Sequence, residues 1–437
     1  MEISQGAKIA LELLHKAGYE AYLVGGCVRD LIMKIPAHDY DITTNATPEE
    51  MKKVFFGYTT IETGIKHGTI TFLYNKEPIE ITTYRIEGKY KDNRHPETVE
   101  FTTKLENDLL RRDFTMNALV YNENEGIIDL FGGQKDIASK TIRAIGVAEN
   151  RFKEDALRIL RAMRFSSQLG FEIEEETKKA MVKCAPLLHN ISAERISQEL
   201  NKLLIGKNVK NVILDCYEIL GEILPEIKKM HGFDQCNKYH IYNVLEHTAI
   251  SVESIDPVAH LRLAMLLHDT GKVYTFTRDE NGTGHFYGHN KVSSEIARDF
   301  LNKYKYDNFT KERVVQLVKI HDTPIEMDRI FIKKRLNRLG KDAFFDLLKV
   351  KRADNLAQNP KYFWLDKLNE MENIAREIVE ENEFTLSSLK IDGNDLITLG
   401  IKGKKIGEVL NLLLNEVIEE KIPNEREALL KRATKLI

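Results

Sequence analysis

Two aspartates separated by a single residue, Asp39 and Asp41, form the first group in the sequence that could do chemistry. In a β-strand, residues i and i+2 point to the same side, so the two carboxylates would repel each other unless a cation neutralises them. Mg²⁺ suits this role, because it binds carboxylate oxygens and completes its shell with substrate phosphates. Taken alone, the pair could equally be a solvated acidic end of a strand.

The segment before these aspartates could hold a phosphate. Tyr22–Val24 is expected to be a strand, Gly25 and Gly26 follow it, and a helix carrying Arg29 is expected next. Two glycines at such a turn let backbone N–H groups approach a phosphate, and the helix N-terminus adds partial positive charge. A Gly-Gly pair alone is usually only a turn. Glu80, in the strand sequence PIEITTYR, could be a third carboxylate of the site or a plain surface residue.

Imidazole and carboxylate groups form a second set further along the chain. Its six members are His247, His268, Asp269, His289, His321 and Asp354. His268 and Asp269 belong to the sequence HDTGK, which is expected to close a helix that starts near His260. A lone His-Asp pair is usually structural, but six such residues on separate helices are not expected of core histidines. This ligand chemistry favours Mn, Ni, Fe or Zn over Mg, and Asp322 and Lys272 are candidates for supporting or phosphate contacts.

The elements that must position these side chains change in type along the chain. Strands are expected at 21–24, 69–74, 79–84 and 99–102, which predicts an α+β segment with a small mixed sheet, whereas the sequence from about residue 142 onward is helical. Segment 151–170 is expected to be one helix ended by Gly170. Asp155, Arg158, Arg161 and Arg164 recur on it at every third position, which by itself could be a salt-bridged surface helix.

Four motifs in series carry a family resemblance over roughly residues 15–225. They are GGCVRD, HDYDI, LRRDFTMNAL and EDALRILRAMRF, and they resemble the class II tRNA nucleotidyltransferase and bacterial poly(A) polymerase family. The resemblance implies a polymerase-β-like head that uses two metal ions to join a nucleotide to a 3′-hydroxyl with release of pyrophosphate. It assigns the metal ions, expected to be Mg²⁺, to Asp39 and Asp41.

The resemblance also assigns nucleotide contacts. Gly25, Gly26, Arg29 and Arg112 would contact the nucleotide, and Asp113 and Asn117 would support the sugar region. Asp155 and Arg158 would read the base, while Arg161 and Arg164 would meet phosphate or backbone charge. An aspartate accepts from the exocyclic amine of cytosine or adenine and an arginine donates to the ring acceptors beside it, whereas uracil and guanine present the opposite groups. The protein could therefore select C and A without a nucleic-acid template.

Addition of CCA to the 3′ end of tRNA, from CTP and ATP, is the favoured activity. Segment 84–101 resembles the intact flexible loop of enzymes that add the terminal A, and segments 389–393 and 400–417 resemble the tail of CCA-adding enzymes. An A-adding enzyme or a poly(A) polymerase is the alternative. In that tail, Lys402, Lys404 and Lys405 could bind RNA phosphate or could belong to a solvated turn.

The histidine set resembles the HD-domain phosphohydrolase superfamily. His247, His268, Asp269 and Asp354 match its basic pattern, and His289 and His321 match the extra ligands of its two-metal members. The resemblance implies a helical domain that activates water for attack on a phosphoester. The competing hypothesis is a chain that is mainly a metal-dependent phosphohydrolase of RNA ends, with the head serving for RNA capture. A non-catalytic RNA-binding protein is disfavoured by Asp39 and Asp41.

Composition sets the outer limits of these interpretations. The chain has 437 residues, of which 42% are hydrophobic and 30% charged, and its net charge of -3 excludes a generic polycation. Its four cysteines form no CxxC pair, and neither a spanning segment nor a signal peptide is expected, which favours the cytoplasm. The expected domains are a head (1–141), a helical neck and body with the base-selecting helix (142–225), an HD domain (226–360) and a helical tail that contacts tRNA (361–437).

Overall fold

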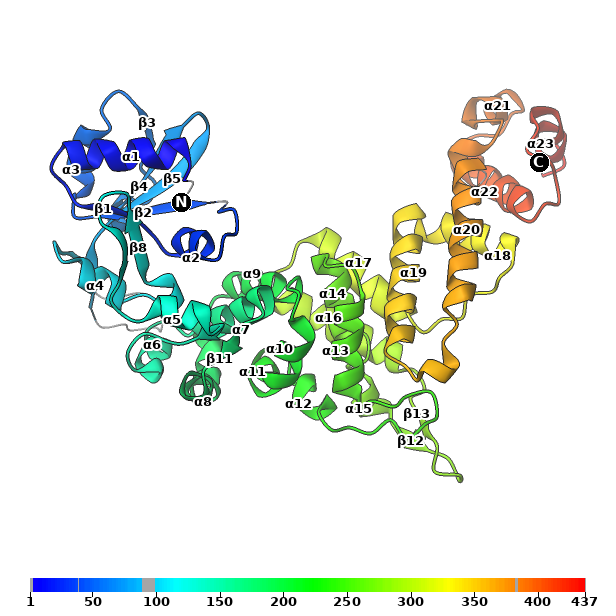
Figure 1. Cartoon of the computed structure of the whole chain (residues 1–437). Helices are drawn as coiled ribbons and strands as arrows, with labels where there is room; N and C mark the ends of the chain where they lie inside the picture. The colour runs from blue at the N-terminus through cyan, green and yellow to red at the C-terminus, as the bar shows by residue number, and fades with distance from the viewer. Residues whose placement is uncertain (1–2, 38, 89–98, 382–383, 437) are drawn as a thin grey trace. The chain divides into compact units, whose positions relative to one another are not determined.

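The computed structural model describes residues 3–37, 39–88, 99–381 and 384–436. The chain forms two compact units, Met1–Pro225 and Glu226–Ile437 (Figure 1). The first unit begins with a mixed sheet and continues with helices, and the second is almost entirely helical. The predicted α+β class is therefore confirmed. The finer division into four domains stays a prediction.

The sheet of the first unit positions the segments that carry the glycine turn and the aspartates. Seven strands lie in the order β3-β4-β5-β2-β1-β8-β9. β2 and β5 are parallel and the other neighbours are antiparallel. Helix α1 (Gln5–Lys16) packs on β1, β2, β4 and β5, and Figure 1 shows it lying across the strands. The strands span Ala21–Val24 (β1), Tyr40–Thr44 (β2), Thr59–Ile61 (β3), Thr69–Tyr74 (β4), Glu77–Thr83 (β5), Leu119–Asn122 (β8) and Gly126–Asp129 (β9).

The expected strand–glycine–helix turn forms directly after β1. All four residues of β1 are buried, and helix α2 (Gly26–Ile32) follows. Gly25 has φ +81°, a conformation that residues with a side chain rarely adopt. A Cβ atom at this position would also lie 3.4 Å from an Arg112 guanidinium nitrogen. The turn thus needs glycine for its conformation and for the approach of Arg112.

The segment between β5 and β8 is described in part. β6 (Arg85–Glu87) pairs antiparallel with β7 (Val99–Phe101), so the strand expected at 99–102 is present. The loop that was expected to indicate addition of the terminal A includes 89–98, which lie outside the described residues, as does position 38 of the HDYDI motif. Helix α4 (Leu105–Leu110) and the 3-10 helix Thr115–Asn117 follow, and they bring Arg112, Asp113 and Asn117 beside the turn.

The single helix expected over 151–170 is wrong at its beginning. The chain forms α6 (Ala148–Glu154) and α7 (Leu157–Leu169), with Asp155 in an extended conformation between them. The Asp155 carboxylate accepts a hydrogen bond from the backbone N–H of Leu157, as an N-terminal cap does, so it stabilises a helix start rather than a helix interior. The predicted end is confirmed, since Gly170 caps α7 with φ +73°.

The remainder of the first unit packs against α7. Helix α9 (Ala193–Leu204) makes the most extensive contact with it, and α10 (Val209–Asp215) packs beside them. β10 (Thr141–Ile142) pairs in parallel with β11 (Glu172–Ile173). The other helices of this part are α5 (Gly133–Ala138), α8 (Glu175–Cys184) and α11 (Tyr217–Ile223), after α3 (Pro48–Val54) in the sheet region.

The second unit has a helical cluster at its centre, followed by two further hydrophobic cores. The cluster consists of α13 (Val244–Ser254), α14 (Ala259–Leu267), α16 (His289–Lys303), α17 (Asn308–Ile320) and α19 (Lys341–Leu356), with the short α12 (Glu226–Met230) and α15 (Lys272–Thr275) beside it. A small hairpin, β12 (Thr277–Arg278) and β13 (Gly284–His285), precedes α16. α18 (Arg329–Leu339) and α20 (Leu365–Glu381) share one further core, and α21 (Gly393–Thr398), α22 (Lys404–Ile418) and α23 (Arg426–Ala433) share the other.

The structure also bears on smaller predictions about the lysine-rich segment, the cysteines and membrane-spanning helices. The lysine-rich segment is only partly a turn, because α22 begins at Lys404 directly after Gly403, which has φ +60°. Lys402, Lys404 and Lys405 are all exposed. The four cysteines are free thiols, as their spacing predicts. Within the described ranges, no helix combines the length and apolarity needed to cross a membrane.

Candidate functional site

A cleft of about 710 Å³ in the first unit collects the residues predicted for nucleotide transfer. It lies between the glycine turn, the start of β2, the segment after α4, and helices α7 and α9. Its lining includes the predicted residues Gly25, Gly26, Arg29, Asp39, Asp41, Arg112, Asp113, Asn117, Asp155, Arg158, Arg161 and Arg164. Segments far apart in the sequence therefore meet at one open site.

Three carboxylates lie together at one end of this cleft. Asp41 is in β2 and is paired in register with Glu80 of the parallel strand β5, which brings Glu80 to the site although it is not part of the lining. Asp39 precedes the first residue of β2, so the strand argument for this pair holds for Asp41 alone. Partial loss of water and the charges of Glu80 and Asp39 raise the pKa of Asp41 to about 6, although Arg112 opposes the shift. A divalent cation would remove this repulsion.

A chain of polar side chains links the glycine turn to α7. Arg29, which is only 8% exposed, donates to Asp30 and, over 3.0 Å, to the amide oxygen of Asn117. Asn117 donates over 3.2 Å to Asp113, whose other oxygen accepts from Arg161 over 2.8 Å. Burial opposes the charge on Asp113, but Arg161 and Asn117 hold its pKa at about 2. The predicted sugar-supporting residues are thus held rigidly between the head and the helix.

The two predicted base-reading residues are held by separate partners. Arg195 of α9 donates to both oxygens of Asp155, at 2.7 and 3.3 Å, and so fixes the orientation of the carboxylate. Arg158 donates over 2.8 Å to Glu154 and over 2.7 Å to the backbone oxygen of Arg111. Asp155 therefore does not lie on the same helical flank as the arginines, which corrects the expectation from their spacing.

Sequence reasoning missed several residues that line this cleft, Arg195 and Phe165 among them, and also Glu199, which is not part of the lining. Arg195 holds Asp155, and Glu199, one turn further along α9, pairs with Arg164 over 3.0 Å. The ring of Phe165 lies within 5.4 Å of the guanidinium carbons of Arg29, Arg161 and Arg164. Oppositely charged residues at i and i+4 in ERISQEL are a sign of a polar helix face, but this sign does not identify the partner.

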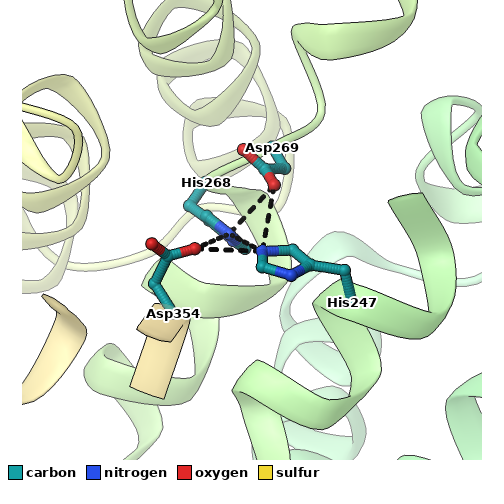
Figure 2. Close-up of side chains that lie close together, drawn as sticks. All are labelled: His247, His268, Asp269 and Asp354. Atoms are coloured by element: carbon teal, nitrogen blue, oxygen red, sulfur yellow. Dashed lines mark hydrogen bonds and ion pairs between the residues drawn. The ribbon is translucent and has the colours of Figure 1, made fainter. Parts of the chain in front are cut away.

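The second site is a buried cluster in the second unit, and it brings all six predicted metal ligands together. His247, His268, Asp269 and Asp354 form one group, and Asp269, His289 and His321 form a second that shares Asp269. In each group the possible ligand atoms lie within 4.8 Å of one another. Figure 2 shows the first group, with the imidazoles of α13 and α14 facing the two carboxylates. The nearest of these contacts is 3.0 Å, between His247 Nε2 and Asp354.

Backbone carbonyls orient all four imidazoles in the same way. The Nδ1 atoms of His247, His268, His289 and His321 lie 3.1, 2.6, 2.8 and 2.6 Å from the carbonyl oxygens of Ala357, Met265, Phe286 and Val318. Nδ1 must carry the proton to donate to a carbonyl, so in the neutral ring each Nε2 presents a lone pair to the centre. His247 and His268 Nε2 are 3.3 Å apart, and those of His289 and His321 are 3.2 Å apart. A metal cation between the two rings, or a proton on one of them, would remove the repulsion in each pair.

Asp269 lies between the two groups with one oxygen toward each. Oδ2 is 3.2 Å from His268 Nε2 and Oδ1 is 3.4 Å from His289 Nε2, while neither oxygen has a hydrogen-bond partner of good geometry. Lys272 Nζ forms an ion pair with Oδ2 at 2.7 Å. Burial opposes the charge on Asp269, but His268 and Lys272 hold its pKa well below its usual range. A buried carboxylate with open lone pairs and flanking imidazoles fits two bridged transition-metal ions.

A cavity of about 320 Å³ opens onto this centre. Asp322 and Lys272, which were candidates for supporting contacts, line it together with Asp354. His240 also lines it and was missed by sequence reasoning. Burial and the nearby charge of Lys272 lower the pKa of His240 to about 3, so its ring is neutral at physiological pH. The cavity therefore leaves the centre accessible from one side.

Comparison with known proteins identifies the class of the first unit. Residues 21–143 match the family described as "Poly A polymerase head domain", and residues 170–230 match the "Probable RNA and SrmB- binding site of polymerase A". Residues 275–433 match tRNA nucleotidyltransferase domain 2. The fold and the cleft thus define a nucleotidyltransferase, a class that uses divalent metal ions.

Whole-chain relatives give the particular family. The CCA-adding enzyme of Bacillus velezensis is 33% identical over 95% of this chain and 95% of its own, and that of Oceanobacillus iheyensis is 35% identical over 95% and 94%. The chain belongs to the CCA-adding enzyme family. With the enzyme of Lactobacillus delbrueckii it shares 51% identity, over 49% of this chain and 54% of that one, so this match spans about half of each protein.

Solved structures agree in fold over nearly the whole chain. The Bacillus stearothermophilus CCA-adding enzyme in complex with CTP is 28% identical, with a TM-score of 0.76 over 99% of this chain and 97% of that one. The Thermotoga maritima CCA-adding enzyme complexed with tRNA has a TM-score of 0.61 at 21% identity, over 99% and 96%.

Proposed function

We propose that the chain adds C and A nucleotides from CTP and ATP to the 3′ end of tRNA, in the cytoplasm, with release of pyrophosphate. The observation that carries this proposal is the single cleft that unites the glycine turn, Asp39 and Asp41, beside which Glu80 lies in register with Asp41, and the Asp155 region. Membership of the CCA-adding enzyme family supports the choice of substrates. An A-adding enzyme or a poly(A) polymerase is the alternative.

The residues divide the work of transfer between them. Asp39, Asp41 and Glu80 would hold Mg²⁺, which supplies positive charge for the attacking 3′-hydroxyl and for the leaving pyrophosphate. Gly25, Gly26 and the side chain of Arg112 line the region where the triphosphate would bind. The Gly25 N–H donates to the carbonyl oxygen of Leu119, so Gly26, at the start of α2, is the glycine whose N–H would contact a phosphate.

The sugar and the base are held on the opposite side of the cleft. Asp113 and Asn117 would support the sugar, because the network from Arg29 to Arg161 fixes both side chains. Asp155 would accept from the exocyclic amine of C or A, and Arg195 holds its carboxylate in position for that purpose. Arg158 would donate to the base after leaving Glu154. The RNA strand would meet Arg161 and Arg164 in the cleft and Lys402, Lys404 and Lys405 in the tail.

Replacement of Asp41 by asparagine tests the transfer site. Asp41→Asn removes a metal ligand whose stabilisation matters chiefly in the transition state, so addition should fall by at least about a hundredfold with the fold intact. Glu123→Gln, an exposed acidic residue of the same unit, is the matched control. Sequencing the 3′ ends made from tRNA that stops before C, CC and CCA distinguishes CCA addition from A addition. Near-normal addition by folded Asp41→Asn would overturn the assignment.

A second candidate function belongs to the buried metal centre. The observation that favours it is the convergence of four imidazole Nε2 atoms and two carboxylates beside an open cavity. Two transition-metal ions, such as Mn, Ni, Fe or Zn, would bind a phosphoester and make water a stronger nucleophile. The protein orients the imidazoles through backbone carbonyls, and Lys272 offers a positive charge beside Asp269.

The two activities can be separated by mutation, because every ligand of the metal centre lies in the second unit. The double variant His268→Ala with Asp269→Ala should abolish hydrolysis of phosphomonoesters or cyclic phosphodiesters and spare CCA addition, while Asp39→Asn should do the reverse. The readouts are phosphate release with added Mn²⁺, CCA addition and the thermal midpoint. Loss of thermal stability and addition together, with no ester cleaved by the wild type, would show that the centre is a structural clamp.

A further inference from the structure

Two aromatic rings lie at the mouth of the cavity over the metal centre, and no step described so far uses them. His285 and Tyr287 are stacked with an interplanar angle of 7° and a centroid distance of 5.3 Å. Both line the cavity, and Tyr287 is 76% exposed. We propose that this aromatic pair stacks on the base of a nucleoside phosphate whose phosphate group occupies the metal centre. The inference rests on the proposed phosphohydrolase function.

The two rings belong to the end of the hairpin and the turn that follows it. His285 ends β13, Tyr287 lies in the turn before α16, and their stacking places both rings on the same side of this segment. Phe286, between them, also lines the cavity; its ring contacts Phe276 and lies near the ammonium of Lys272. The contacts of Phe286 therefore anchor the segment that carries the aromatic pair.

Polar contacts hold the aromatic pair in place without covering its free face. His285 Nε2 lies 3.0 Å from an oxygen of Asp279, across the hairpin. The Tyr287 hydroxyl lies 3.4 Å from His285 Nδ1. Both ring nitrogens of His285 thus face partners within the hairpin. A preorganised aromatic surface binds a flat base at a lower cost in conformational entropy than a mobile side chain would.

The same loop connects the aromatic pair to the metal ligands. Tyr287 is followed by Gly288, with φ +75°, and then by the ligand His289, whose Nδ1 faces the Phe286 carbonyl at 2.8 Å. Tyr287, His289 and Asp269 line the same cavity of about 320 Å³, which lies within the size range of small-molecule sites. In a nucleotide, the sugar links the phosphate to the base. A base on the aromatic pair and a phosphate beside Asp269 can therefore belong to one molecule.

The substrate class that this geometry fits is a nucleoside monophosphate or the terminal nucleotide of an RNA. In the hydrolysis, the oxygen of water forms the new bond to phosphorus and the ester P–O bond breaks. The leaving nucleoside hydroxyl takes a proton, and inorganic phosphate is the second product. Base stacking contributes to binding and not to this chemistry, so its loss should raise KM and leave kcat largely unchanged.

The test compares esters with and without a base on the full-length protein with added Mn²⁺. Adenosine 3′-phosphate carries the base, and glycerol 3-phosphate is a phosphomonoester without one. Tyr287→Leu should raise KM for adenosine 3′-phosphate by about 5- to 100-fold, the range for loss of one stacking contact, and leave glycerol 3-phosphate unchanged. Tyr287→Phe should retain wild-type values. Phe309→Leu is the matched control, because Phe309 is a 60% exposed aromatic of the same unit outside the cavity lining.

A second readout does not depend on turnover. Proton NMR of adenosine 3′-phosphate with Zn²⁺, which is diamagnetic, in place of Mn²⁺ should show upfield shifts of the base protons with the wild type and smaller shifts with Tyr287→Leu. Equal effects of Tyr287→Leu on both esters, or unchanged NMR shifts, would overturn the stacking site while the hydrolase stands. If the wild type cleaves neither ester nor a 2′,3′-cyclic phosphate, the proposed hydrolase falls, and the stacking site falls with it.

Discussion

Replacement of Arg195 by alanine should weaken the discrimination of C and A from U and G. Arg195 is the side chain that fixes Asp155, through contacts of 2.7 and 3.3 Å to its two oxygens. Without it, the carboxylate keeps only the hydrogen bond from the backbone N–H of Leu157, at 3.1 Å. The carboxylate can then rotate, and its preference for an exocyclic amine over a carbonyl oxygen is reduced.

The geometry of the pair sets the expected magnitude. Hydrogen bonds to charged groups contribute about 1.5–3 kcal/mol when buried. The two side chains are 25% and 19% exposed, so solvent screens part of this contribution. We therefore expect a loss of about 1–2 kcal/mol, which is about a 5- to 30-fold loss of discrimination. Arg195→Lys keeps the charge but loses the two-point contact, and its effect should be intermediate.

The assay is kcat/KM for each of the four nucleoside triphosphates on a tRNA that lacks its CCA end. The ratio of kcat/KM for CTP and ATP to kcat/KM for UTP and GTP separates discrimination from overall binding. Arg143→Ala is the control, because Arg143 forms ion pairs with Asp136 and Glu174 in the same unit but does not line the cleft. An equal decrease for all four nucleotides in Arg195→Ala would refute the positioning role.

Three further outcomes follow from other parts of the structure. Arg161 holds the pKa of Asp113 at about 2, against an ordinary 3.8, so the pair should stabilise the fold by on the order of 2 kcal/mol above about pH 4 and lose this contribution toward pH 2. The destabilisation by Asp113→Asn, measured by urea unfolding, should therefore be smaller at pH 3 than at pH 7. An equal destabilisation at both pH values would contradict this. Gly271→Ala should lower the metal content and the thermal midpoint, because the new Cβ atom would lie 2.4 Å from the His289 carbonyl oxygen. In the control Gly288→Ala, the new Cβ atom would meet no atom within 4 Å, so the variant should lose only about 1–2 kcal/mol of stability through backbone strain. Mn²⁺ at a hundred times its dissociation constant should stabilise the second unit by about 2.7 kcal/mol, and a chelator should reverse this in calorimetry.

Local sequence signals predicted the site residues better than their contacts. The glycine turn, the aspartate pair and the HDTGK segment each depend on residue types within a few positions, and each appears in the expected kind of element except Asp39, which precedes β2. The break before α7 was not predicted, because the partner that holds Asp155 in its extended conformation lies 40 residues away. The helical spacing of the residues around Asp155 therefore gave no sign that Asp155 caps the start of a helix.

At the metal centre too, the sequence predicted residue types but not the contacts that depend on tertiary structure. The six ligands of the centre were found from their types and from a family pattern, and the structure brings them together. His240 and the stacked pair of His285 and Tyr287 were not found, since they lie in loops or in a two-residue strand, which are too short to show a periodic pattern. Their relation to the centre depends on how a hairpin folds over a cavity, which is a property of tertiary structure.

The way in which the imidazoles are oriented has a consequence for mutational studies of this centre. Three of the four acceptor carbonyls lie three residues before the histidine they fix, at Met265, Phe286 and Val318. A carbonyl belongs to every amino acid, so substitution of these residues leaves the acceptor in place. Alanine scanning would therefore register the ligands but overlook what selects their protonated nitrogen. Related chains could diverge at these positions and still present the same four lone pairs, and only an amide-to-ester replacement in the backbone would weaken the acceptors themselves.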